Sequence, residues 1–333
     1  MTSGLVRRRL PGGARILCLE AGSADAPVAV QLWIAAGTAA ERPQEHGCAH
    51  LLEHMLFKPY AAGGPAAASG DLARAIETLG GDVNAFTSHD ETVLHATVPS
   101  PAWGGAVDAI LWAALRPALD AAETLREREV VVEEIKQYDD EPGQKSVQAL
   151  LGRLHAGHAY ARPVLGLTRE VRSHTARRLR AFHRRTYAGE RLTLVVVGPV
   201  AAADVVARAR RLLAAAGEGA PLRRGRPAEA APSRIHAIVD RGDVQEAHLF
   251  FGWRGPGLGD PAVAALDVAG VVLGHGEASR LVREVRRSAS TSSVTSTPRS
   301  ISRAGRHLRD RRPQRGRRRR GRRRPRSSRR SSA

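Results

Sequence analysis

The 333-residue chain contains only two cysteines, Cys18 and Cys48. Two thiols are too few for a disulfide-stabilised scaffold or a cysteine-rich zinc cluster, so their scarcity favours a reducing compartment. The sequence also lacks an apolar run of about 18 residues, and its first residues, MTSGLVRRRLPGG, lack the apolar core of a signal peptide. We therefore expect a soluble cytoplasmic protein without membrane spans.

Acidic residues are nearly absent from the end of the chain. Residues 291–333 contain 17 arginines and a single acid, Asp310, so this segment carries +16 of the formal charge of +19. The preceding 290 residues are therefore almost neutral. From residue 288 on there is no aromatic residue and no apolar periodicity, so these residues cannot form a core. We expect residues 288–333 to be a disordered basic tail, or else an out-of-frame translation of an arginine-rich coding sequence.

Aromatic residues are also scarce, with 13 in the whole chain and none in the basic tail. An arginine-rich segment can bind nucleic acid through counterion release without any fold. Stacking on bases requires aromatic side chains, and the tail has none. The composition therefore disfavours nucleic acid as a partner despite the positive charge.

The remaining sequence alternates between strand and helix patterns. Strands are expected within residues 5–36 and 82–98, and at the aliphatic run RLTLVVVGPV. Helices are expected at CAHLLEHMLF, at DLARAIETLG and over the stretch from Ala102 to Tyr138. This order indicates an α+β fold.

A composition change divides the chain. Residues 216–233 are rich in Gly, Pro, Ala and charge, which is typical of a linker. After them, IHAIVD and AHLFFGW are similar to the strands expected near Ile16 and Leu32, which suggests a weak internal repeat. We therefore expect domains at 1–215 and 234–287.

The strongest chemical motif is His50-Leu51-Leu52-Glu53-His54. On a helix, residues four apart share a face, so both imidazoles can reach one metal ion while Glu53 stays beside it. Two imidazoles and a carboxylate leave a position for water, which zinc acidifies, and Glu53 is then the general base. A chain with 13 histidines produces this pattern by chance at roughly a few per cent, so a third ligand is needed.

The segment LREREVVVEEIKQYDDEP offers four acids for that third position: Glu127, Glu129, Glu133 and Glu134. The alternative interpretation is an ordinary solvated helix face, which is what most acid-rich helices present.

Several segments in one order resemble the M16 peptidases, the group of pitrilysin, insulysin and the mitochondrial processing peptidase. They are HGCAHLLEHMLFK, GGDVNAFTSHDET, LREREVVVEEI, HAYARPVLG, LRAFHRRTY, LTLVVVGPV, QEAHLFFGW and GHGEASRLVREVR. The resemblance implies an antiparallel-rich sheet with packed helices, a zinc-binding peptidase domain at 1–215 and a partial second copy at 234–287. It also implies zinc bound by His50, His54 and Glu134, with Glu127 as an accessory acid.

The resemblance further implies that Asn84, Ala85, Phe86 and Thr87 form an edge strand that holds an extended peptide by main-chain hydrogen bonds. The alternative is an ordinary core strand. His158 is expected to support a loop, because the metal already has three protein ligands.

The second half departs from the family pattern. Complete members use an Arg and a Tyr from a second homologous half, whereas the last tyrosine here is Tyr187. The leading hypothesis is a zinc endopeptidase that cuts extended or unfolded peptides, with Glu53 as general base. The alternative is a truncated, non-catalytic scaffold or partner subunit, paired with a second M16 chain or with itself as a homodimer.

Overall fold

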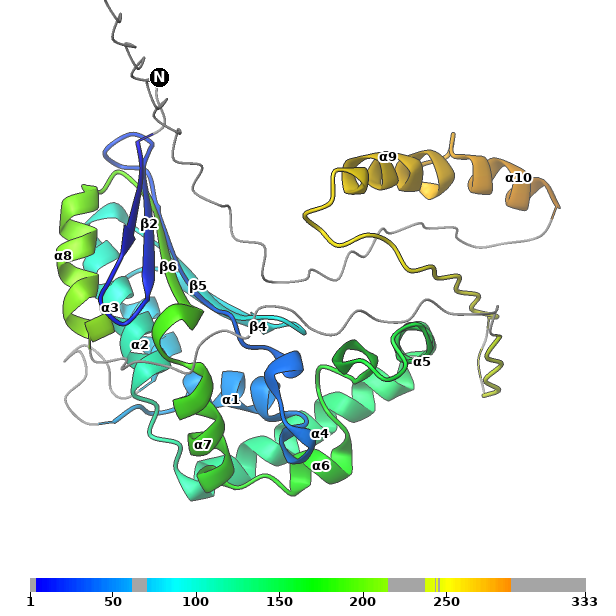
Figure 1. Cartoon of the computed structure of the whole chain (residues 1–333), viewed down its shortest axis with the longest axis horizontal. Coiled ribbons are helices and arrows are strands. Elements are labelled where there is room, and N and C mark those ends of the chain that lie inside the picture. Colours follow the sequence, from blue (N-terminus) through cyan, green and yellow to red (C-terminus); the bar gives the residue numbers. More distant parts are fainter. Residues whose placement is uncertain (1–3, 62–70, 215–236, 243, 245, 289–333) are drawn as a thin grey trace, which may run out of the picture.

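The computed structural model describes residues 4–61, 71–214, 237–242, 244 and 246–288. Up to residue 214, these residues form one sheet with helices packed against it (Figure 1). The expected α+β fold with an antiparallel-rich sheet is therefore confirmed.

Within the described residues the sheet has six strands in the order β1-β2-β6-β3-β5-β4. The strands are β1 (Leu5–Arg9), β2 (Arg15–Glu20), β3 (Val28–Ile34), β4 (Asp82–Thr87), β5 (Thr92–Val98) and β6 (Leu192–Gly198). Neighbouring strands are antiparallel except for β2 and β6, which are parallel. This order leaves β1 and β4 at the two edges of the sheet.

Alternating side chains explain why one face of the sheet is buried. In β3, Val28, Val30, Leu32 and Ile34 are fully buried, whereas Trp33 between the last two is exposed. Side chains directly opposite each other in the register, such as Leu32 and Leu194, lie on the same face. Each such buried aliphatic side chain stabilises the fold by roughly 1.5–3 kcal/mol.

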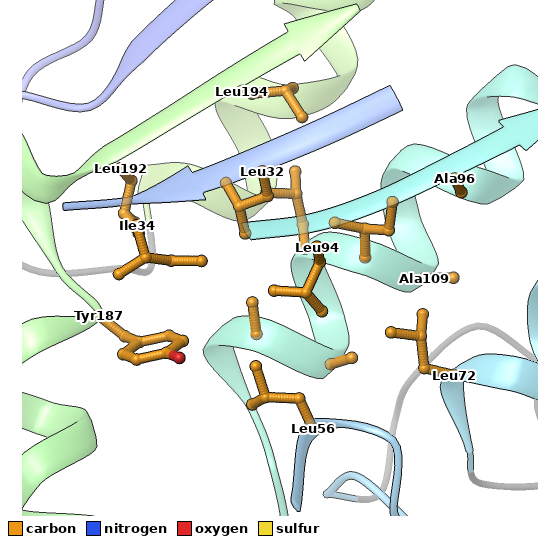
Figure 2. Close-up of a cluster of buried hydrophobic side chains, with 14 of the residues drawn as sticks. Leu32, Ile34, Leu56, Leu72, Leu94, Ala96, Ala109, Tyr187, Leu192 and Leu194 are labelled. Atoms are coloured by element: carbon orange, nitrogen blue, oxygen red, sulfur yellow. The ribbon is translucent and has the colours of Figure 1, made fainter. Parts of the chain in front are cut away.

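Helices cover that buried face (Figure 1). The α-helices of this part are α1 (Cys48–Leu56), α2 (Leu72–Thr78), α3 (Trp103–Leu115), α4 (Ala121–Asp140), α5 (Pro142–Leu154), α6 (Thr168–Arg172), α7 (Ala176–Thr186) and α8 (Ala202–Leu213). Short 3-10 helices lie at Thr38–Ala40, Pro43–Glu45, Ser100–Ala102, Ala159–Ala161 and Gly189–Arg191. Figure 2 shows the core where Leu56 of α1, Leu72 of α2 and Ala109 of α3 approach Leu32 and Leu94 of the sheet.

The helical stretch expected from Ala102 to Tyr138 is divided into α3 and α4. Pro117 lies in the break, and proline can neither donate a backbone hydrogen bond nor fit inside a helix without a clash. Asp120 then begins α4, its carboxylate accepting hydrogen bonds from the backbone N–H groups of Ala122 (2.8 Å) and Glu123 (3.1 Å).

The expected strands of the second copy are not formed. Residues 237–240 and 247–253, the described parts of IHAIVD and AHLFFGW, contain no strand, and the elements that follow are α9 (Ala262–Gly274) and α10 (Arg280–Ser288). A strand needs a hydrogen-bonded neighbour, and the described residues offer none beside this segment. The linker expected at 216–233 and the tail from residue 289 lie outside the described residues.

Helix α9 exposes many apolar side chains. They include Leu266, Val268, Val271, Val272 and Leu273. No helix within the described ranges combines the length and apolar content needed to cross a membrane.

Candidate metal centre

The site is built on α1, whose first turn is held by Glu41 and packs closely against the backbone of Leu165. Gly47 precedes the helix with a φ of 87°, and a Cβ there would lie 3.1 Å from the carbonyl oxygen of Leu165. Gly47 has no side chain to cap the helix, and Glu41 takes that role by accepting a hydrogen bond from the backbone N–H of Ala49 at 2.8 Å. Glu41 is buried, and burial raises its pKa to about 8.

His50 and His54 follow on one face of α1, one turn apart. Their ring centroids are 4.8 Å apart, and α1 packs against α4, which carries Glu134. Glu134 Oε2 lies 3.7 Å from His50 Nε2 and 3.5 Å from His54 Nε2. The structure therefore brings together the two histidines of the sequence motif and the glutamate that the family resemblance implied as the third ligand.

The donor set fits a zinc ion. One nitrogen or oxygen from each of His50, His54 and Glu134 lies within 4.8 Å of the other two, and among the described residues this is the one such group of three. Atoms about 2.0–2.2 Å from a tetrahedral ion lie roughly 3.4 Å apart, close to the separations of Glu134 Oε2 from His54 Nε2 (3.5 Å) and from His50 Nε2 (3.7 Å). Two imidazoles and one carboxylate are also the ligand types found in hydrolytic zinc sites.

Burial and charge control the protonation of these ligands. Burial, together with the neighbouring His54, lowers the pKa of His50 to about 4, so His50 is neutral near pH 7 and can offer a lone pair. Burial alone would lower the pKa of His54, but hydrogen bonding to Glu134 and Glu127 raises it. The same contact with His54 lowers the pKa of Glu134. The two shifts both favour the charged forms of His54 and Glu134.

Glu127 lies about two helical turns before Glu134 on α4. It is next to Nδ1 of the His54 ring. Its Oε2 is 3.3 Å from His54 Nδ1, and its Oε1 is 2.6 Å from the ammonium group of Lys58. The Glu127 side chain is only 8% exposed. This is the arrangement in which a carboxylate orients a metal-binding imidazole through its other ring nitrogen.

Glu53 is held from the sheet. The hydroxyl of Thr87, at the end of β4, donates a hydrogen bond to Glu53 Oε2 at 2.5 Å. Burial raises the pKa of Glu53, and the Thr87 hydrogen bond partly opposes this by favouring the charged form. A carboxyl group with a raised pKa beside a metal site is suited to accept and return a proton.

The four residues expected to hold substrate lie on β4, which pairs only with β5 among the described strands. Phe86 is 43% exposed and its ring packs edge-on against Trp33, while Asn84 accepts a hydrogen bond from the N–H of Ala85. Ala85 packs toward the core. Thr87 instead points its hydroxyl at Glu53, which the sequence did not indicate.

The other acids of α4 are surface groups. Glu129 pairs with Arg172 at 3.1 Å, and Glu133 pairs with Lys136 at 2.7 Å on the exposed side of the helix. His158 accepts a hydrogen bond from the N–H of Tyr160 and packs against its ring, as a loop-supporting residue does. Sequence reasoning missed Glu41 and Lys58, since neither has ligand spacing.

The chain matches two models of known protein families. The family model for insulinase (peptidase family M16) matches residues 17–166, which include all of the candidate site. The model for the peptidase M16 inactive domain matches residues 173–307.

Relatives support the same assignment. An uncharacterised zinc protease of Mycobacterium leprae is 34% identical over 294 residues, covering 86% of this chain. One from Mycobacterium tuberculosis is 34% identical over 288 residues, covering 84%. This chain spans 63% of the length of each of them.

A crystal structure from Pseudomonas fluorescens, described as a peptidase M16 inactive domain, shares the fold with a TM-score of 0.71 at 24% identity. The alignment covers 85% of this chain and 68% of that one. The sequence motifs, the fold and both family models agree, and the chain belongs to the M16 peptidase family.

Proposed function

We propose that this chain is a zinc-dependent endopeptidase that hydrolyses extended or unfolded peptides. The observation that supports this most strongly is the convergence of His50, His54 and Glu134 within 4.8 Å, with Glu53 on the same helix. His50, His54 and Glu134 would hold the ion. Zinc bound there would act as a Lewis acid that polarises the scissile carbonyl and makes water a better nucleophile near pH 7.

Substrate binding is proposed at the edge strand β4. An extended peptide added to this edge would form main-chain hydrogen bonds with little demand on its sequence. The contact between Thr87 and Glu53 supports this location, because it joins the end of β4 directly to the helix that carries the base. Asn84, Ala85 and Phe86 would then flank the peptide.

Glu53 is proposed as the general base. Its carboxylate would remove a proton from the attacking water and then deliver that proton to the leaving amine. The raised pKa of the buried Glu53 supports this role, since it makes the carboxylate a stronger base towards the attacking water. Glu127 and Lys58 would not touch the substrate.

The domain arrangement is part of the proposal. We infer a zinc-binding peptidase domain at 1–215, a linker at 216–233 and a partial second domain at 234–287. The exposed apolar side chains of α9 favour contact between the second segment and another protein. That protein would be a second M16 chain or, in a homodimer, a second copy of this chain. The two buried thiols, Cys18 and Cys48, fit a reducing cytoplasmic location.

A second candidate function is a non-catalytic partner subunit that contributes half of a substrate chamber to another M16 chain. It is favoured by the exposed apolar side chains of α9. Zinc content and cleavage of a fluorogenic, unstructured peptide, measured on wild type and Glu53→Gln, separate the two. Zinc binding with hydrolysis that Glu53→Gln abolishes supports the endopeptidase. Hydrolysis that is unchanged by Glu53→Gln, or that is absent from the wild type, supports the non-catalytic partner subunit.

A further inference from the structure

Lys58 lies just beyond the end of α1 and reaches back toward the metal centre. Its backbone N–H donates a hydrogen bond to the carbonyl of Met55 at 3.3 Å, which keeps it close to the last turn. Its ammonium group lies 2.6 Å from Glu127 Oε1. Lys58 is 34% exposed, whereas the carboxylate it contacts is almost completely buried.

The carboxylate of Glu127 connects this lysine to a proposed ligand. One oxygen faces Lys58 and the other lies 3.3 Å from His54 Nδ1, while Nε2 of the same ring faces Glu134. By contrast, His50 Nδ1 is buried and has no hydrogen-bond partner among the described residues. His54 is thus the imidazole whose orientation depends on a hydrogen bond at Nδ1, made by Glu127.

The charges around the site also favour a cation at this position. Glu53, Glu127 and Glu134 contribute three carboxylates, of which Glu127 is almost completely buried and Glu134 is 43% exposed. A divalent ion and Lys58 together supply three positive charges. Without Lys58, Glu127 would be a buried carboxylate whose remaining ion-pair partner is the ring of His54, and a buried charge without compensation is strongly unfavourable.

We propose that Lys58 is a positioning residue for the metal centre. It fixes Glu127 so that Glu127 accepts a hydrogen bond from the N–H at His54 Nδ1, which would leave the lone pair of Nε2 free for a metal ion. This inference rests on the metal site of the proposed function. It concerns metal affinity, and Lys58 touches neither substrate nor reacting atoms.

An opposing effect makes the test decisive. A lysine near a zinc ion repels it, so a role as a mere nearby charge predicts tighter zinc binding when the charge is removed. A positioning role predicts the reverse, because residues that orient metal ligands typically contribute about 10- to 100-fold in affinity. The two interpretations therefore differ in the direction of the change.

The experiment measures zinc dissociation constants at fixed pH by competition with a chromogenic chelator. The variants are Lys58→Met, Lys58→Arg and, as a matched control, Lys136→Met. Lys136 also forms an ion pair with a glutamate of α4, but at an exposed position. We expect about 10-fold or more weaker binding for Lys58→Met, partial recovery for Lys58→Arg and no change for the control.

A double-mutant cycle tests whether Lys58 acts through Glu127. Lys58→Met should weaken zinc binding in the wild-type background and have no weakening effect in the Glu127→Gln background. Tighter binding by Lys58→Met, or equal weakening in both backgrounds, overturns the proposal. Thermal unfolding of the zinc-free proteins verifies folding, and Lys58→Gln replaces Lys58→Met if the latter does not fold.

Failure of the broader proposal would look different. If the wild type binds no stoichiometric zinc, the metal site itself is wrong. If the wild type binds zinc and Lys58→Met binds it equally well, only the role of Lys58 is wrong.

Discussion

The hydroxyl of Thr87 donates a hydrogen bond to the carboxylate of Glu53 across the junction between β4 and α1. Thr87 and Glu53 belong to separate elements, the edge strand and the helix of the metal ligands. The contact couples the position of the proposed base to that of the proposed peptide-binding strand. Any displacement of β4 would therefore also disturb Glu53.

Replacing Thr87 by Val should impair catalysis without removing zinc. Valine keeps the shape of the side chain but cannot donate to Glu53, and a hydrogen bond to a charged group contributes about 1.5–3 kcal/mol. We expect kcat/KM for an unstructured peptide to fall by about 10-fold or more, with unchanged zinc content. Steady-state kinetics and metal analysis measure these two quantities.

Two controls accompany this variant. Thr87→Ser retains the hydroxyl and should keep most of the activity, whereas Thr97→Val, at an exposed position on β5, should have no effect. A Thr87→Ser variant as impaired as Thr87→Val would show that the methyl group, and not the hydrogen bond, is what matters.

Glu53→Gln should abolish hydrolysis while leaving the ligands intact. The amide cannot accept a proton from water, and loss of a general base typically lowers the rate by about 100- to 10,000-fold. The variant should still bind one zinc ion per chain, because His50, His54 and Glu134 are unchanged. Retention of wild-type activity would remove Glu53 from the mechanism.

Removing the third ligand should weaken zinc binding, and the adjacent acid provides the control. Glu134 faces both histidines, whereas Glu133 pairs with Lys136 at the surface. Zinc at 100 times its dissociation constant should raise the free energy of unfolding of the wild type by about 2.7 kcal/mol. Thermal unfolding with and without zinc should show this gain in Glu133→Gln but not in Glu134→Gln; the opposite pattern would make Glu133 the ligand.

The buried cap Glu41 should make stability depend on pH. Its pKa is raised from 4.5 to about 8 in the folded protein, so folding favours the protonated form. The resulting stabilisation is complete below about pH 4.5 and is lost as the pH rises toward 8. In this window Glu41 should lower the free energy of unfolding by up to about 1.4 kcal/mol per pH unit.

Glu41→Gln should remove that contribution, since its amide oxygen can still accept from the N–H of Ala49 without carrying a charge. Chemical unfolding of the metal-free protein between pH 5 and 8 measures the slope. Glu20→Gln, at an exposed position, serves as the control and should keep the wild-type slope. Equal slopes for wild type and Glu41→Gln would show that Glu41 does not titrate in this range.

Local patterns were sufficient to predict most of the domain. The alternation in β3 and the spacing of His50 and His54 are properties of a few neighbouring residues, so the sequence carries them directly. The assignment of Glu134 needed the family resemblance, because Glu127, Glu129 and Glu133 on the same helix are chemically equivalent in the sequence.

Other features could not be read because they depend on distant contacts. Glu41 caps α1 from eight residues upstream, and Lys58 meets Glu127 only when α1 packs on α4. Residues 237–240 and 247–253, the described parts of the two strands expected in the second copy, form no strand for the related reason that a strand pattern needs a partner strand, which local sequence does not supply.

The place of β6 in the sheet has a consequence for biosynthesis. Leu194 is paired with Ile16 on one side and with Leu32 on the other, so β6, which joins both parts of the sheet, is the last of the described strands to be synthesised. As the chain leaves the ribosome, β2 and β3 must wait for more than 150 residues of translation before their shared neighbour arrives. Pairing between residues so distant in the sequence slows folding. Throughout that interval the nascent chain would carry unpaired strand edges, which are the kind of exposed segment that chaperones protect.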